Sequence, residues 1–201
     1  MPPSIRSRGY LPHMERAEAI YFVTFRLADS LPRELVIRLQ REREALARAN
    51  QARSVGAHLI PNRERLDKLR LLLQKAERCL DDGLGECYMR NPHVAKIVAD
   101  AVRHFDAQRY RLRAWSVMPN HVHVLFSPLP GQPLKSILHT WKSYSALQAN
   151  KFLGRTGGFW QREYFDHLVR NEASLLKITR YVQENPRKAG LHNWPWVGVL
   201  P

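Results

Sequence analysis

The sequence predicts an α+β fold, in which one antiparallel sheet of the split βαβ, or ferredoxin-like, type carries helices on one face. Short segments rich in β-branched and aromatic residues alternate with segments of helical period, in the order strand, helices, strand, strand, helix, strand, helix. Only a turn separates the strands expected at 110–117 and 121–128, which indicates a hairpin. No internal repeat breaks this order, and the 201 residues fit a single domain over 1–201.

The first part of the chain predicts an arm, a strand and an insertion. Residues 1–18 are rich in Arg and Pro without a sustained period, so we expect a flexible basic arm. Residues 19–27 are dense in β-branched and aromatic side chains and predict the first strand. Two charged segments with apolar stripes of helical spacing, at 33–53 and 63–80, predict a helical hairpin inserted at about 33–81.

The remaining elements follow from caps and periodicity. Asn91 and Pro92 open a helix, and Asn171 caps the last one, which we expect to stop at Pro186. Dense aromatic residues predict a last strand between the two final helices. The expected ranges are helix 91–105, strand 110–117, strand 121–128, helix 133–150, strand 159–165 and helix 171–185.

The charge balance points to a polyanionic partner. There are 32 Lys and Arg residues against 18 Asp and Glu, which gives a net charge of +14 and a pI near 10.4. The basic residues are spread along the chain instead of forming one amphipathic anchor, so nucleic acid is favoured over a membrane. The two cysteines form no CxxC pair, and no apolar run is long enough to cross a bilayer. We therefore expect a soluble protein of a reducing compartment.

Two histidines stand out in the strand at 121–128. Residues alternate there, so His121 and His123 share one face while Val122, Val124 and Phe126 share the other. The α-carbons of His121 and His123 should lie roughly 6.6 Å apart. At this separation both imidazole rings can converge on one divalent ion. A single histidine would more simply pack on the sheet, but two on one face favour a metal site that needs a third ligand.

Tyr181 and Asn185 lie one turn apart in the last helix, on the same side and just off its apolar stripe. A tyrosine in such a place is most often a packing residue, and an asparagine before proline is most often a helix cap. Spacing alone therefore favours a packing role for Tyr181 and a capping role for Asn185.

Five segments together resemble one family. They are Val23-Thr24-Phe25, Met118 to His123, Phe159 to Arg162, Tyr164 to Arg170 and Tyr181 to Leu191, and in this order they look like the single-tyrosine HUH transposases, nearest to the REP-associated tyrosine transposases of bacteria. The resemblance covers most of the chain outside the hairpin and the arm. It implies a nuclease and strand transferase for single-stranded DNA on a ferredoxin-like sheet.

The same resemblance implies roles for the residues above. His121, His123 and Asn185 would be metal ligands for Mg²⁺ or Mn²⁺, and Tyr181 would be the nucleophile that forms a 5′-phosphotyrosine intermediate. The partner would be single-stranded or hairpin-containing repeat DNA, bound by a monomer or homodimer in the bacterial cytoplasm, associated with the nucleoid. The basic candidates for DNA binding, with one histidine, are Arg111, Arg113, Lys135, Lys142, Arg162, His167 and Arg170.

Two other functions compete with this one. A domesticated relative of the same fold could bind hairpin DNA without cleaving it, although His121, His123 and Tyr181 are all present. A metal hydrolase of small phosphoesters would call for a second histidine motif or a carboxylate-rich site, and it would leave the +14 charge unused. Nicking of DNA distinguishes the three.

Overall fold

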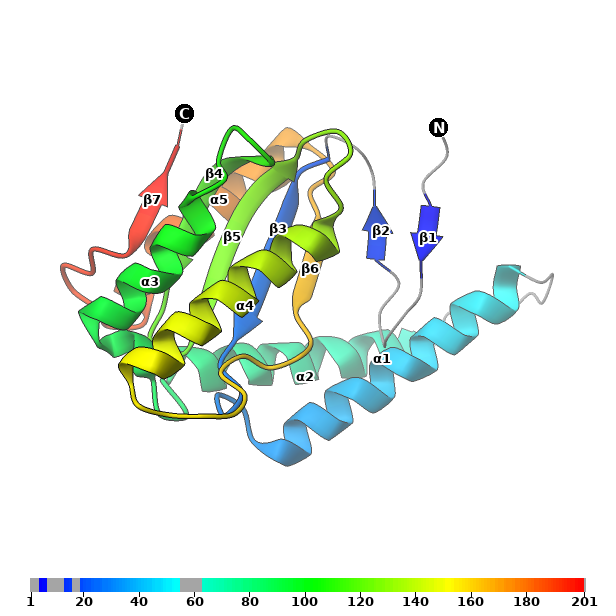
Figure 1. Ribbon diagram of the computed structural model, residues 1–201. Helices are drawn as coiled ribbons and strands as arrows, with labels where there is room; N and C mark the ends of the chain where they lie inside the picture. The colour runs from blue at the N-terminus through cyan, green and yellow to red at the C-terminus, as the bar shows by residue number, and fades with distance from the viewer. Residues whose placement is uncertain (1–3, 7–12, 16–18, 55–62, 201) are drawn as a thin grey trace.

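The computed structural model describes residues 4–6, 13–15, 19–54 and 63–200. A five-stranded antiparallel sheet lies at its centre, with the strand order β6-β3-β5-β4-β7 (Figure 1). β3 and β4 both pair antiparallel with β5 and therefore run parallel to each other with β5 between them, which is the split βαβ arrangement. The predicted α+β fold class is confirmed. The strands are β3 (Tyr21–Arg26), β4 (Tyr110–Val117), β5 (His121–Pro128), β6 (Phe165–Leu168) and β7 (Val197–Val199).

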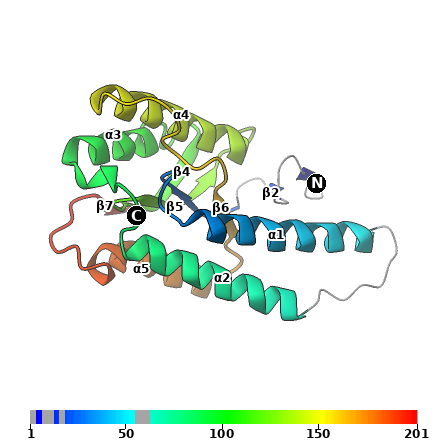
Figure 2. The ribbon, with the colours of Figure 1, turned by 90° about the horizontal axis from the view of Figure 1, so that it is seen from below.

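Helices cover both faces of the sheet, so the expectation that they lie on one face is wrong. Figure 2 shows α3 and α4 on one side and α2 and α5 on the other. All eight residues of β5 are buried, and this requires that both faces of the strand are covered. The helices are α1 (Arg33–Ser54), α2 (Arg63–Asp81), α3 (Pro92–Arg103), α4 (Leu134–Phe152) and α5 (Glu172–Lys188), with a short 3-10 helix η1 (Tyr88–Arg90).

The main core lies between the sheet and the helices α3 and α4. Val122, Val124 and Phe126 of β5 point into it, as the alternation predicted. Ala114 of β4 and Leu125 of β5 lie on the opposite face, where they pack against Val182 of α5. The histidine face of β5 is therefore covered by α5.

The helical hairpin forms its own small core. Leu35 and Leu39 of α1 pack with Leu72, Ala76 and Leu80 of α2, and this confirms the inserted hairpin as an element. In Figure 1 the hairpin crosses beneath the sheet and extends beyond β6.

Two local predictions differ from the structure. The last helix does not stop at Pro186 but continues to Lys188, because proline removes only its own N–H while the N–H of Ala189 still donates to Asn185 O at 3.0 Å. Phe159 and Trp160 are buried in the main core, and the strand β6 starts only at Phe165. Trp160 forms only an isolated antiparallel bridge, with Leu27, so the aromatic character of this segment reflects burial more than strand pairing.

Three strands of the structure were not predicted, because the segments are short. β7 pairs with β4 at the sheet edge through three residues. In the arm at 1–18, most of which lies outside the described residues, β1 (Ser4–Arg6) pairs with β2 (His13–Glu15). Three-residue strands are too short to show an alternating pattern.

Gly85 holds the loop that joins the hairpin to the domain. Its φ is +88°, and an added Cβ would lie 2.9 Å from Asp29 O. Gly85→Ala is expected to lower the free energy of unfolding by about 2 kcal/mol, measured by urea denaturation, since it combines strain with a backbone clash. Gly131→Ala is the matched control, because Gly131 also has positive φ but open space around it. Equal losses in the two variants would contradict the clash.

Candidate active site

The two histidines of β5 meet at their Nε2 atoms. His121 and His123 are 1% and 3% exposed, and their Nε2 atoms lie 3.0 Å apart. At this separation at most one proton fits between the two nitrogens. The predicted shared face and convergence of the rings are present in the structure.

Neighbouring side chains fix the orientation of both rings. Asn120 donates through Nδ2 to Leu84 O at 2.9 Å. Its Oδ1 is therefore the atom that faces His121 Nδ1 at 2.7 Å, and it accepts a hydrogen bond from the Nδ1–H group of His121. A neutral His121 then presents an unprotonated Nε2. On the other ring, Thr24 Oγ1 lies 2.8 Å from His123 Nδ1 and can accept a proton in the same way. Such partners are typical of metal-binding histidines.

Both imidazoles are neutral at physiological pH. Burial lowers the pKa of His123 to about 3. Burial lowers the pKa of His121 well below its usual value, and the positive charge that a protonated His123 would carry lowers it further. Neutral imidazole is the form that binds metal ions.

The helix α5 brings two further side chains to the pair. The Tyr181 hydroxyl lies 3.5 Å from His123 Nε2, and Asn185 Nδ2 lies 3.2 Å from the same atom. Asn185 Oδ1 is buried without a hydrogen-bond partner in the described chain. Phe22 stacks on His123 with ring centroids 5.4 Å apart and meets the Tyr181 ring edge-on at 5.9 Å. The structure thus brings together the four residues His121, His123, Tyr181 and Asn185.

The hairpin contributes Glu77, a residue that no sequence pattern singled out. Tyr181 donates its hydroxyl proton to Glu77 Oε1 at 2.9 Å, over a separation of 104 residues. Burial raises the pKa of Tyr181, and the charge of Glu77 raises it further. A glutamate in a highly charged helix looks like any solvated residue until the hairpin is placed against α5.

A cavity of about 240 Å³ lies beside the histidine pair. The sheet contributes His121, His123 and Arg26 to its wall, and the hairpin contributes Arg43 and Glu77. The cavity therefore lies between the face of β5 that carries the histidines and the inserted hairpin.

Comparison with known proteins finds a family that one part of the chain resembles. Residues 89–185 match the family model of IS200-like transposases, a segment that contains both histidines, Tyr181 and Asn185. This segment, which is just under half of the chain, is similar to the IS200-like transposases. An uncharacterized protein of Haemophilus influenzae is 29% identical over an alignment that covers 38% of this chain and 54% of that protein. The alignment thus spans about half the length of this relative.

Two solved structures are similar at low sequence identity. One is a REP-associated tyrosine transposase bound to a REP hairpin, with a TM-score of 0.48, 16% identity and coverage of 96% of this chain and 81% of that chain. The other is a candidate transposase from Deinococcus radiodurans R1, with a TM-score of 0.38, 14% identity and coverage of 90% and 96%. Both likenesses are remote.

The residues expected to bind DNA are scattered over the structure. Lys135 and Lys142 lie on α4, which packs on the face of the sheet opposite the histidines. Lys142 donates to the backbone oxygens of Gln161 and Arg162, both at 2.8 Å, which is a structural role, and its burial lowers its pKa to about 8.

Of the other five candidates, three lie in the strands β4 and β6, and two lie in the segments just before and just after β6. His167 of β6 stands opposite Phe22, on the histidine face, and is exposed. Arg113 donates to Ser127 Oγ at 3.5 Å, towards the far end of β5. Arg111, Arg162 and Arg170 are exposed. In the described ranges no helix is long and apolar enough to cross a bilayer.

Proposed function

We propose that this protein is a metal-dependent endonuclease and strand transferase for single-stranded DNA, with Tyr181 as its nucleophile. The observation that carries the proposal is the 3.5 Å distance from the Tyr181 hydroxyl to His123 Nε2, at the point where two buried neutral imidazoles converge. The motifs quoted above suggest hairpin-containing repeat DNA as the substrate, bound by a monomer or homodimer in the bacterial cytoplasm. The net charge of +14 favours a polyanionic partner.

The residues around the histidine pair fit a divalent cation. His121 and His123 offer two Nε2 atoms, and a half-turn of the Asn185 amide would bring its unpartnered Oδ1 towards His123 in place of Nδ2. Among the described residues no group of three His, Cys, Asp or Glu side chains is placed to hold a metal ion, so the third protein ligand has to be of another type. A ligand set of nitrogen and amide oxygen without thiolate suits Mg²⁺ or Mn²⁺. Such an ion would neutralise the non-bridging oxygens of the phosphodiester.

In the proposed reaction the Tyr181 oxygen attacks the phosphorus atom and forms a P–O bond to the enzyme. The P–O bond to the 3′-oxygen breaks, which leaves a 5′-phosphotyrosine and a free 3′-hydroxyl once that oxygen takes up a proton. The phenol proton passes to Glu77, which already accepts its hydrogen bond. Attack by another 3′-hydroxyl on the phosphotyrosine reverses the step and joins strands without a nucleotide cofactor.

The proposal is tested with labelled single-stranded DNA that carries a hairpin, incubated with the protein and Mg²⁺ or Mn²⁺ and separated on a denaturing gel. We expect a nicked product and a slowly migrating protein–DNA adduct, both lost with a chelator. A gel shift without any nick would favour the non-catalytic DNA-binding alternative. Nicking without an adduct would favour direct attack by water.

Glu77→Gln is expected to slow single-turnover cleavage by about 10²-fold, because the amide cannot accept the phenol proton as a base. The remaining activity should rise with pH, since hydroxide then takes over this role. Asp67→Asn makes the same change of charge on the same helix, at an exposed residue paired with Arg70, and should leave the rate unchanged. A Glu77→Gln variant that cuts at the wild-type rate with the wild-type pH profile would remove Glu77 from the reaction.

A further inference from the structure

Arg26 lies beside the histidine pair on the same face of the sheet. In the antiparallel pairing of β3 and β5, Arg26 stands directly opposite His121, and Thr24 stands opposite His123. Residues directly opposite each other point to the same face, and the contact of Thr24 with His123 agrees with this placement. The Arg26 side chain therefore enters the cavity next to His121.

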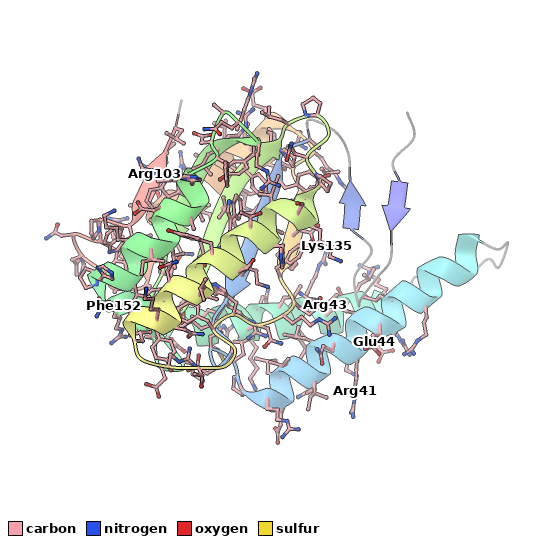
Figure 3. The ribbon with its side chains drawn as sticks, viewed as in Figure 1. Arg41, Arg43, Glu44, Arg103, Lys135 and Phe152 are labelled. Carbon is pink, nitrogen blue, oxygen red and sulfur yellow. The ribbon has the colours of Figure 1, made fainter. Side chains whose placement is uncertain are left out.

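Arg43 reaches the same cavity from the hairpin. Its guanidinium lies 5.8 Å from the centroid of the Phe165 ring in β6, and Phe165 is the cross-strand partner of Thr24. Figure 3 shows Arg43 on the side of α1 towards the sheet and Arg41 on the outer side. One guanidinium from the sheet and one from the insertion thus line one cavity.

Two positive charges and the carboxylates of Glu77 and Glu163 thus share one partly buried cavity. Burial lowers the pKa of both groups, that of Arg26 to about 10, and the positive charge of Arg43 contributes to the lowering at Arg26. The negative charges of Glu163 and Asp166 raise the pKa of Arg43 and so partly offset the effect of burial. Within the described ranges, however, neither guanidinium forms an ion pair with a carboxylate, and Arg26 donates only to Ser30 Oγ at 3.4 Å. Partly buried like charges are retained where an anion compensates them.

We propose that Arg26 and Arg43 form a second phosphate site, which binds the DNA backbone phosphate next to the one that is cleaved. The inference rests on the proposed function and deepens it, since it assigns a substrate contact to the insertion. Guanidinium groups bind phosphate through paired hydrogen bonds, which suits this role. Leu31, Leu39 and Leu73 line other parts of the cavity and can pack against deoxyribose.

The test measures binding of a labelled oligothymidylate by fluorescence anisotropy over a range of NaCl concentrations, in buffer without Mg²⁺. A phosphate contact does not depend on base sequence, so this probe suffices. Arg43→Gln is expected to weaken binding about tenfold at low salt and to reduce the slope of log K against log[NaCl] by about 0.7, the value for one phosphate on a single strand. Arg43→Lys keeps the charge and should keep the slope while losing part of the affinity.

Arg41→Gln is the matched control, since Arg41 is exposed on the same helix and outside the cavity. It should leave both affinity and slope close to those of the wild-type protein. Equal slopes for Arg43→Gln and the wild-type protein, or equal losses for Arg43→Gln and Arg41→Gln, would overturn the phosphate site. Nicking by the wild-type protein tests the proposed function separately, so a failure of one is distinguishable from a failure of the other.

Discussion

Tyr181→Phe is expected to abolish both nicking and the covalent protein–DNA adduct, a loss of at least about 10⁴-fold in single-turnover rate. The substitution removes only the hydroxyl oxygen, which lies 3.5 Å from His123 Nε2, and keeps the ring that packs edge-on against Phe22. Folding and DNA binding should therefore survive. The measurement is a denaturing gel of labelled DNA, together with a gel shift for binding.

Two other tyrosines serve as controls. Tyr144 is 53% exposed on α4, on the opposite side of the sheet, so Tyr144→Phe should cut DNA at the wild-type rate. Tyr164 is the stricter rival, because it lines the same cavity as the histidines. Mass spectrometry of the trapped adduct decides between them. A nucleotide on Tyr144 or Tyr164 would make the assignment of Tyr181 wrong.

The parts of the site within one element were predictable from the sequence. Alternation along β5 placed His121 and His123 on one face because the side-chain period of a strand is two. Helical spacing placed Tyr181 and Asn185 one turn apart for the same kind of reason. Spacing could not show that α5 covers the histidine face, since that depends on packing between Val182, Ala114 and Leu125. The family resemblance supplied the roles that spacing left open.

The parts of the site between distant elements were not predictable. Glu77 meets Tyr181 across 104 residues, and Arg43 joins Arg26 only because the hairpin lies over the cavity. Nothing in a local pattern distinguishes these three charged residues from their many solvated neighbours. The inserted hairpin was predictable as an element, but the contacts on which its proposed role rests are visible only in the tertiary structure.

His123→Ala is expected to abolish cleavage and also the stabilisation of the protein by Mn²⁺. A ligand that binds only the folded state at 100 times its Kd adds about 2.7 kcal/mol, which raises the Tm of a domain of this size by roughly 5–10 °C. Without His123 one of the two Nε2 donors is lost, so the variant should show no rise in Tm on addition of Mn²⁺.

The shift in Tm on adding Mn²⁺, and not the Tm itself, is the informative quantity. His123 is buried, stacks on Phe22 and contacts Thr24, so the alanine variant should be less stable than the wild-type protein even without metal. His139→Ala is the matched control, since His139 is an exposed histidine of α4, on the opposite side of the sheet. It should retain both the shift and cleavage. A full Mn²⁺ shift in His123→Ala, or cleavage at the normal rate in saturating Mn²⁺, would show that the ion is held elsewhere.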